Sequence, residues 1–275
     1  MLNKAPVLPA LCVFLLFNLP TLVQAASICQ PDRIDASARV RHVVDGDTLV
    51  LSDERSVRLI GMNTPEIGHG KRRSEAFGDA ARLRLIQLIA KHDHQVKLRY
   101  GKDKFDRHGR LLAHVFAGDE NVTEVMLRQG LAVHVSFSPN LWQHKCYQRA
   151  ENEARFQKRR IWRLPFYHYP PVQQLSKGGF HMIQGDVTRV SLRGKRWEFK
   201  LSNRVTLSIS KKNRRYFDKA ILATLLGKRV FVRGWFRKRK KRFYLGLKHP
   251  DMIKVYPVSC LRQQCPASQA RALMP

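Results

Sequence analysis

Residues 38–62 (ARVRHVVDGDTLVLSDERSVRLIGM) constrain the fold more than any other stretch of the chain. Apolar residues alternate or cluster over short distances, and polar turns separate them at Asp45-Gly46 and at residues 52–54. This pattern is typical of consecutive short β-strands joined by tight turns. It predicts that the first part of the fold is built on strands that follow one another along the chain.

Helix and strand patterns alternate after these strands. Apolar residues at helical spacing predict a helix from about Ser74 to Lys91, with Ser74 as its N-cap. Strands are expected at 94–100 and 111–117, with a polar loop at 101–110 between them. Two further helices are expected, one ending at Gly130 and a long amphipathic one over 142–162.

The pattern restarts after residues 165–171 (PFYHYPP), which we interpret as part of a rigid aromatic linker. Strands are predicted at 180–190, 196–201 and 204–210, then a helix at 214–227, then a hairpin around the basic run at 237–242. Three strands, a helix and a hairpin is the order of an oligonucleotide-binding (OB) barrel. The first region has the same order with helices added. The expected fold is therefore mainly β with α: a five-stranded OB-type barrel plus helices, followed by a second, smaller OB-like barrel.

The chain is strongly basic. It contains 51 Lys and Arg against 21 Asp and Glu, a formal net charge of +30. Such a charge raises the local concentration of polyanions, so nucleic acid is the leading expected partner, ahead of anionic lipid or another surface polymer. A hydrophobic content of 44% is enough to build a core and argues against global disorder.

The N-terminus resembles a signal peptide over residues 1–25. Lys4 precedes a short apolar region, and VQA (23–25) resembles a cleavage site. Asn18 and Pro20 interrupt the apolar region, which is too short for a comfortable membrane span, although an uncleaved anchor is the alternative. We therefore expect an exported protein, periplasmic or secreted, without a stable membrane anchor.

Export would leave four cysteines in an oxidising compartment, and these allow three pairings. We favour Cys29 with Cys146, and Cys260 with Cys265, which would close a small C-terminal loop. A zinc site is the alternative, although the spacings are not those of a zinc ribbon.

Three short motifs carry the candidate chemistry: DGDT (45–48), RLIGMNTPE (58–66) and FDRHGR (105–110). Each alone is typical of an ordinary turn, a helix lead-in or a solvated loop. Together and in this order, they resemble the staphylococcal nuclease (thermonuclease) family over about Val40 to Leu164, with LRQGLA (127–132) and Ile161-Trp162 extending the likeness. The resemblance implies a calcium-dependent nuclease on an OB barrel, exported or embedded in a larger protein. Such a nuclease cuts DNA and RNA with little sequence preference and leaves 3′-phosphate ends.

The resemblance also assigns a calcium site. It implies the Asp47 carboxylate, the Asn63 side chain and the Thr64 main-chain carbonyl as ligands, and calcium is a hard cation that takes oxygen ligands. Asp45 would orient this group without binding the ion directly. The best-known family member has aspartate at the position of Asn63, so a neutral ligand here predicts weaker calcium binding.

Phosphodiester hydrolysis needs an activated water and neutralisation of the charge that grows on the phosphoryl group. By the resemblance, Glu66 is the general base. Arg58 and Arg110 form a guanidinium clamp on the phosphate, for which planar bidentate donors are suited. Arg110 would also stabilise the departing oxygen.

Other positions depart from the family pattern or have no assigned chemistry. Ser136 and Ser138 stand near positions where the family uses tyrosines to hold a base, and Phe137 between them is expected in the core. His108 is expected to be a solvated loop residue. The three histidines His42, His134 and His144 show no metal-ligand pairing in the sequence.

The expected domains are the nuclease-like domain at 38–164, a linker at 165–176, a basic OB-like domain at 177–257 and a tail at 258–275. In the second domain, basic runs at 211–215 and 237–242 lie near five aromatic residues that are candidates to stack bases: Trp197, Trp235, Phe236, Phe243 and Tyr244. We expect removal of this domain to weaken substrate affinity and its salt dependence while turnover survives.

The sequence thus predicts an exported calcium-dependent nuclease acting on DNA and RNA, with single strands preferred. One alternative is a non-catalytic polyanion-binding protein on the same fold. The other is an envelope protein that binds anionic lipid or polysaccharide.

Overall fold

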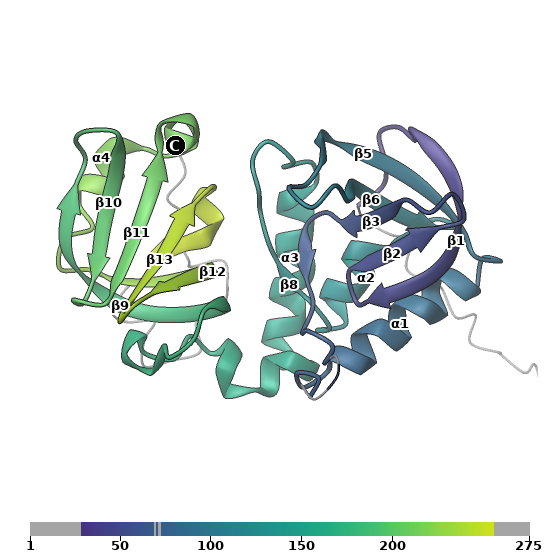
Figure 1. The fold of residues 1–275 in the computed structure, drawn as a ribbon, viewed down its shortest axis with the longest axis horizontal. Helices are drawn as coiled ribbons and strands as arrows, with labels where there is room; N and C mark the ends of the chain where they lie inside the picture. The colour runs from purple at the N-terminus through teal and green to yellow at the C-terminus, as the bar shows by residue number, and fades with distance from the viewer. Residues whose placement is uncertain (1–28, 69, 71–72, 256–275) are drawn as a thin grey trace, which may run out of the picture.

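The computed structural model describes residues 29–68, 70 and 73–255. The expected signal peptide, the expected Cys260–Cys265 pair and the tail at 258–275 lie outside the described residues. Figure 1 shows two β-barrels side by side, with α3 and β8 on the part of the first barrel that faces the second. Within the described ranges, no helix has both the length and the apolar character needed to cross a membrane.

The first barrel is closed by five strands that pair in the order β3-β2-β1-β5-β6, with β3 returning to β6. The β3–β6 pairing is parallel, whereas the other neighbours in this barrel are antiparallel. The strands are β1 (Ala36–Asp45), β2 (Thr48–Leu51), β3 (Ser56–Leu59), β5 (Gln95–Phe105) and β6 (Leu111–Ala117), and β7 (Glu120–Asn121) extends the sheet beyond β6.

Alternation of buried and exposed residues explains why these segments form strands. In β3, Val57 and Leu59 are buried and their neighbours are only partly covered, so one face points into the barrel and the other outward. Residues 101–105, expected in a loop, instead continue β5, where Phe105 pairs with Leu111 across a hairpin. The strands are therefore longer here than the polar sequence suggests.

Helix α1 (Gly78–Ala90) packs Ala81, Leu85, Leu88 and Ile89 into the barrel core. It begins at Gly78 and not at the expected Ser74. The Ser74 hydroxyl instead accepts the Gly68 N–H at 3.2 Å and donates to Asp79. Ser74 therefore stabilises the loop before the helix and does not cap the helix itself.

Two further helices follow β7. In α2 (Val122–Arg128), the Asn121 side chain caps the first turn by accepting the Glu124 N–H. The long helix expected to reach Trp162 is α3 (His144–Phe156), and a short 3₁₀ helix (Arg160–Arg163) follows it. Lys158 and Arg160 have positive φ angles of 50° and 41°, a left-handed backbone that cannot continue an α-helix.

Cys29 and Cys146 form a disulfide with an S–S distance of 2.09 Å, as favoured from the sequence. The bond joins the start of the described chain to α3. Both cysteines are buried in the core of the first barrel.

The second barrel repeats the topology of the first. Its strands pair in the order β13-β11-β10-β9-β12 and close through β12–β13, and β11–β13 is the parallel pair. The strands are β9 (Gly179–Ser191), β10 (Arg196–Leu201), β11 (Val205–Ser210), β12 (Arg229–Arg239) and β13 (Arg242–Leu247), with β14 (Ile253–Val255) added beside β12. Two closed five-stranded barrels with a few helices confirm the predicted fold class.

The helix expected at 214–227 is divided in two. A 3₁₀ helix (Lys211–Tyr216) ends before Phe217, and α4 (Lys219–Ala223) begins after Asp218. The Asp218 carboxylate accepts the N–H groups of Ala220 and Ile221, which fixes the new helix start. Helix α4 follows the third strand of its barrel, as α1 does in the first.

The segment expected to be a linker packs between the barrels. It contains two short 3₁₀ helices (Pro165–Tyr167 and Val172–Gln174). Tyr167 and Tyr169 belong to a buried cluster that includes Val133 of the first barrel and Met182 of the second. Apolar contact therefore joins the two barrels.

Candidate active site

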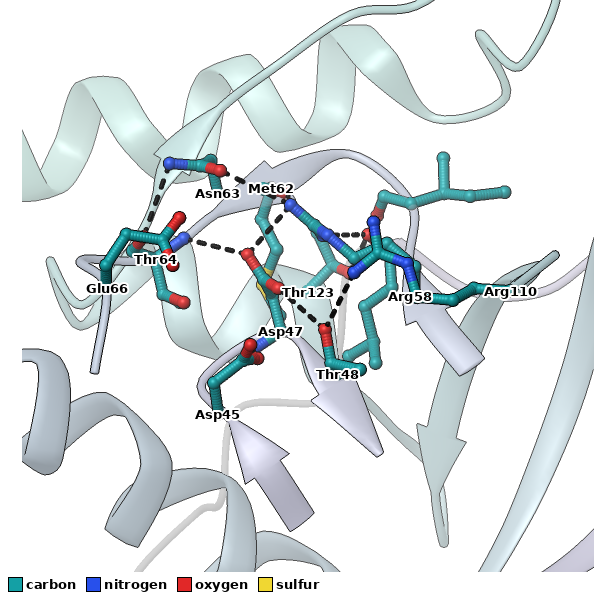
Figure 2. A network of polar contacts seen from close by, with 12 residues as sticks. Asp45, Asp47, Thr48, Arg58, Met62, Asn63, Thr64, Glu66, Arg110 and Thr123 are labelled. Atoms are coloured by element: carbon teal, nitrogen blue, oxygen red, sulfur yellow. Dashed lines mark hydrogen bonds and ion pairs between the residues drawn. The ribbon is translucent and has the colours of Figure 1, made fainter. Parts of the chain in front are cut away.

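The pairing of β2, β3 and β6 brings the three motifs to one corner of the first barrel. Arg58 on β3 pairs with Thr48 on β2 and, on its other side, with Leu112 on β6. The turn that precedes β2 contains Asp47, and the hairpin that precedes β6 ends at Arg110. Figure 2 shows these side chains gathered around Asp47, with Glu66 on the left and Arg110 on the right.

Asp47 is the buried centre of this group, with 6% of its surface exposed. Its Oδ2 lies 2.8 Å from Arg58 Nη2 and accepts the Thr64 N–H at 3.1 Å, and Thr48 Oγ1 donates to its Oδ1. Asp45 accepts the N–H of Asp47 at 2.9 Å, which fixes the turn. Burial raises the pKa of Asp47 to about 6, against the opposing charge of Arg58 and together with the nearby Asp45.

Asn63 and Thr64 supply the other predicted ligand atoms. Asn63 lies on β4 (Met62–Asn63), which pairs with Val133–His134 of β8 and is thereby fixed. Its Oδ1 is 3.4 Å from Arg58 Nη2, and its Nδ2 donates to the Thr64 carbonyl at 3.3 Å. The Asp47 carboxylate, the Asn63 amide and the Thr64 carbonyl are thus buried oxygen atoms joined through Arg58, the Asn63 Nδ2 group and the Thr64 N–H. Such a set fits a hard cation such as calcium.

Gly46 allows the chain to approach Thr64 closely. A Cβ atom at this position would lie 2.7 Å from Thr64 Cγ2 and 2.7 Å from Ala81 Cβ on α1. Only glycine therefore lets the β1–β2 turn pack under Thr64. The sequence suggested a tight turn here, but not this close approach.

The two arginines are held by different partners. Arg58 Nη1 donates to the main-chain carbonyls of Leu59 and Met62 at 2.7 and 3.0 Å. Arg110 pairs with Asp106, whose Oδ2 lies 2.8 Å from Arg110 Nε, and its Nη1 lies 3.4 Å from Thr48 Oγ1. Both guanidinium groups are therefore oriented before any substrate is present.

Sequence reasoning missed two residues of this group, Asp106 and Thr48. Asp106 also accepts the N–H groups of His108 and Arg110, so it shapes the hairpin as well as orienting Arg110. The signal was present in the FDRHGR motif, where an aspartate begins the turn. Thr48 lies between Asp47 and Arg110 because β2 pairs with β3 and β3 pairs with β6, which the sequence does not reveal.

Glu66 is exposed on the loop after β4. Its N–H donates to Glu75 Oε2 at 3.0 Å, and its carbonyl accepts the Glu75 N–H at 2.8 Å. The base of the loop is therefore tied to the residues before α1. Figure 2 shows the Glu66 carboxylate beside Thr64, at the edge of the group that Asp47 centres.

The stretch that stands where the family uses tyrosines to hold a base faces the second barrel. Ser136 is buried and its Oγ donates to Asp251 at 2.8 Å, and Ser138 Oγ donates to the Lys248 carbonyl at 3.0 Å. Phe137 is half-buried against the core of the second barrel, 5.3 Å from the Trp235 ring. These residues belong to the contact between barrels.

The first barrel, with this buried group of oxygen atoms and arginines at its corner, is of the OB type found in nucleases. Residues 56–164 match the family described as staphylococcal nuclease homologue, a range that contains every predicted site residue except Asp47 and Asp45 before it. The chain is 34% identical to a thermonuclease of Staphylococcus intermedius over 129 residues, which are 45% of this chain and 74% of that protein. It is 30% identical to a thermonuclease of Staphylococcus hyicus over the same shares of both chains. It is 31% identical to the endonuclease YncB of Bacillus subtilis over 123 residues, 43% of this chain and 58% of the relative. The chain therefore belongs to the staphylococcal nuclease family.

Proposed function

We propose that this protein is an exported, calcium-dependent endonuclease that hydrolyses DNA and RNA with little sequence preference, favours single strands and leaves 3′-phosphate ends. The observation that carries the proposal is the convergence of a buried set of oxygen atoms, two oriented arginines and Glu66 at one corner of a barrel of this family. A binding protein has no need for a carboxylate base beside a cation site.

Asp47, Asn63 and the Thr64 carbonyl would hold calcium. When bound, the ion supplies positive charge that stabilises the negative charge growing on the phosphoryl group. Asp45 supports this set because its carboxylate fixes the N–H of Asp47. The Arg58 guanidinium lies against Asp47 and Asn63. It would therefore lie beside a phosphate that contacts the bound ion.

The remaining residues move the proton and bind the phosphate. Glu66 accepts a proton from water as the water oxygen bonds to phosphorus, and the bond from phosphorus to the 5′ oxygen breaks. Arg58 and Arg110 donate to the phosphoryl oxygens, and Arg110 stabilises the departing 5′ oxygen until it takes a proton from solvent. Cleavage on this side of phosphorus leaves the phosphate on the 3′ end.

The proposal is tested by incubating the protein with single-stranded DNA, duplex DNA and RNA, with calcium or with a chelator. We expect cleavage only with calcium, and a fall in rate of roughly 10²–10⁴-fold in Glu66→Gln, the range typical of a general base. Glu66 is exposed, so the variant should unfold at the wild-type temperature. Glu54→Gln, at the other end of β2, is the matched control and should keep full activity.

The outcomes separate the alternatives. Binding without cleavage would support the non-catalytic polyanion-binding protein, and neither binding nor cleavage would support the envelope protein. Product ends sensitive to a 3′-phosphatase are expected, and 5′-phosphate ends would contradict the bond assignment.

Export is supported by the buried Cys29–Cys146 disulfide, because structural disulfides persist in oxidising compartments. The corresponding test is N-terminal sequencing of protein recovered from the periplasm and from the medium. A first residue of Ala26 is expected, and a chain retained in the cytoplasm with free thiols would contradict export.

In the second barrel, exposed basic residues favour nucleic-acid binding more than the aromatic residues do. Trp197, Phe236 and Phe243 are buried in its core, and Trp235 packs against Phe137 and Phe180. Tyr244 is thus the one member of the aromatic set without such a core or interface position. Lys240 and Lys241 are exposed at the β12–β13 turn, a loop that contacts nucleic acid in other OB barrels.

A further inference from the structure

Three histidines surround one buried carboxylate where the barrels meet. Asp251 follows β13 and is 3% exposed, and its Oδ2 lies 3.2 Å from His249 Nδ1 and 3.3 Å from His144 Nδ1 on α3. Ser136 Oγ is 2.8 Å from the same oxygen, and His134 Nε2 is 4.0 Å away. The sequence showed no ligand pairing for His144 because Asp251 is 107 residues further along the chain.

Hydrogen bonds compensate the Asp251 carboxylate only in part, because Ser136 Oγ donates to Oδ2 and not to Oδ1. The Asp251 N–H donates to His249 Nδ1 at 3.3 Å, so this nitrogen turns a lone pair, and not a proton, toward the carboxylate. Asp251 Oδ1 is buried and has no hydrogen-bond partner among the described residues. A buried carboxylate in this position is costly unless a cation compensates it.

His134 and Ser136 do not make up the deficit. His134 Nδ1 lies 2.7 Å from the Gly61 carbonyl and must donate to it. The other nitrogen of the neutral ring, Nε2, then carries no proton and donates nothing to Asp251. This Nε2 lies 3.0 Å from Ser136 Oγ, whose single proton is donated to Asp251 Oδ2, so Asp251 Oδ1 still has no donor among the described residues.

No Lys or Arg nitrogen within the described ranges lies within 4.0 Å of the Asp251 carboxylate in an ion pair. Arg233 pairs with Glu151, whose two oxygens are both 2.7 Å from its Nη1, and its Nε donates to the Asp251 main-chain carbonyl at 3.5 Å, not to the carboxylate. Among the described residues, the Asp251 carboxylate therefore has imidazoles around it and no ion pair with Lys or Arg.

The spacing of these atoms is that of a metal site. Zinc binds nitrogen and oxygen ligands at about 2.0–2.1 Å, so two ligands of a tetrahedral ion lie roughly 3.3 Å apart. The observed separations of 3.2 and 3.3 Å match this value. One ligand atom from each of His144, His249 and Asp251 lies within 4.8 Å of the others. The His144 side chain is 20% exposed, which leaves a path for an ion and for water as a fourth ligand.

We propose that His144, His249 and Asp251 bind a divalent transition-metal ion, for which Zn²⁺ is the best match, at the junction of the two barrels. Two imidazoles and one carboxylate are ligands of this class of ion. The site differs from the predicted calcium site, whose atoms are all oxygens. His144 comes from α3 beside the first barrel, and His249 and Asp251 come from the segment after β13 of the second barrel. The ion would therefore link the two barrels.

The experiment uses untagged full-length protein, because a histidine tag would itself bind zinc. The protein is stripped with a chelator, dialysed into excess calcium to occupy the all-oxygen site, and titrated with Zn²⁺ and with Co²⁺. We expect one ion per chain, a Co²⁺ absorption spectrum typical of tetrahedral coordination, and a zinc-dependent rise in the unfolding temperature. Neither readout depends on nuclease activity.

His144→Gln and His249→Gln should each weaken zinc binding by more than roughly a hundredfold, because loss of a residue merely behind a ligand already costs about ten- to a hundredfold. His42→Gln, which removes an exposed histidine on β1, is the matched control and should bind as wild type does. His144 is used because its partial exposure makes its variant more certain to fold than Asp251→Asn.

Two results would overturn the proposal. Equal zinc binding in His144→Gln and wild type would show binding elsewhere on the surface. A wild-type protein that binds no zinc, and whose stability changes only with pH, would show that protonated imidazoles compensate Asp251 instead.

Discussion

Asn63 places a neutral oxygen where its surroundings are already rich in positive charge. Arg58 lies 2.8 Å from Asp47 and 3.4 Å from Asn63, so one guanidinium borders two predicted calcium ligands. With one carboxylate in the set, the arginine offsets most of the negative charge that would attract a cation. The ligand charge, more than the ligand geometry, should therefore limit calcium affinity.

Asn63→Asp is expected to lower the calcium concentration for half-maximal cleavage several-fold, because affinity rises with the charge of the ligands. Initial rates measured across a calcium titration give this value. Asn203→Asp adds the same charge at an exposed position of the second barrel and should leave the titration unchanged. An unshifted midpoint in Asn63→Asp would refute the charge argument.

Individual site residues could be predicted from the sequence where they belong to one short motif. Asp47, Arg58, Asn63, Thr64, Glu66 and Arg110 were all predicted from short motifs, and the structure brings them to one corner of the barrel. Thr48 and Asp106 were missed because their contribution depends on which strands are neighbours. His144 was missed because its partners come from the end of the second barrel.

The order of strands and helices was predictable because the periodicity of apolar residues differs between the two. The residues at which the elements end were not predictable. Helix α3 stops where Lys158 and Arg160 take left-handed backbone angles, and the helix of the second barrel restarts at the Asp218 cap. The two-residue strands β4 and β8 have no periodicity to detect, although their pairing fixes Asn63.

The Cys29–Cys146 bond secures an otherwise peripheral segment to α3. The two cysteines are 117 residues apart, so the bond restricts a long loop in the unfolded chain. Replacing both with serine should lower the free energy of unfolding by about 2–5 kcal/mol, as for other native disulfides. Urea denaturation of wild type with and without reductant, and of the double variant, measures the loss. Reductant should have no effect on the variant, and equal stability of all three samples would contradict the prediction.

A buried ion pair and an apolar cluster join the two barrels. Glu151 of α3 and Arg233 of β12 form a buried ion pair, and Val133, Trp162 and Tyr167 are covered in the cluster between barrels. Although burial favours the protonated form, the Arg233 charge holds the pKa of Glu151 below its usual value. Removing the second barrel would expose this surface as well as remove basic residues. Charge substitutions in the full chain therefore replace deletion as the test of nucleic-acid contact.

Lys240→Gln with Lys241→Gln should weaken binding to single-stranded DNA and reduce its salt dependence. Each lysine that contacts a phosphate contributes about 0.7 to the slope of log affinity against log salt on a single strand. Binding is measured in chelator, so that substrate is not cleaved. The control, Lys91→Gln with Lys97→Gln, removes the same charge around Ser37, near the end of β1 remote from the site. Equal slopes for the two double variants would show that net charge alone acts.

Acid should destabilise the whole molecule through two buried histidines. Burial lowers the pKa of His114 to about 3 and that of His134 to about 4, from an ordinary value of 6.5. Below pH 6.5 the unfolded chain binds protons that the folded chain does not. Stability is therefore complete above that pH and falls as the pH is lowered toward 4, by on the order of 3 kcal/mol for His134 alone.

Urea midpoints between pH 7 and 4.5, measured on chelated protein, test this prediction. His114→Gln should flatten the pH dependence whatever its effect at neutral pH, whereas His42→Gln should leave the slope as in wild type. A slope shared by wild type and His114→Gln would show that other groups cause the acid sensitivity.

The repeated strand order has a consequence for how the two barrels differ. The turn between the first two strands contains Asp47 in the first barrel, whereas residues 192–195 at the corresponding turn of the second include Arg193 and Lys195 and no acidic residue. The second turn therefore offers no carboxylate to bind a cation, and it offers positive charge to a phosphate. The two barrels thus share a strand order and differ in the charge at this turn. At this turn, the first barrel offers a carboxylate to a cation and the second barrel offers only positive charge.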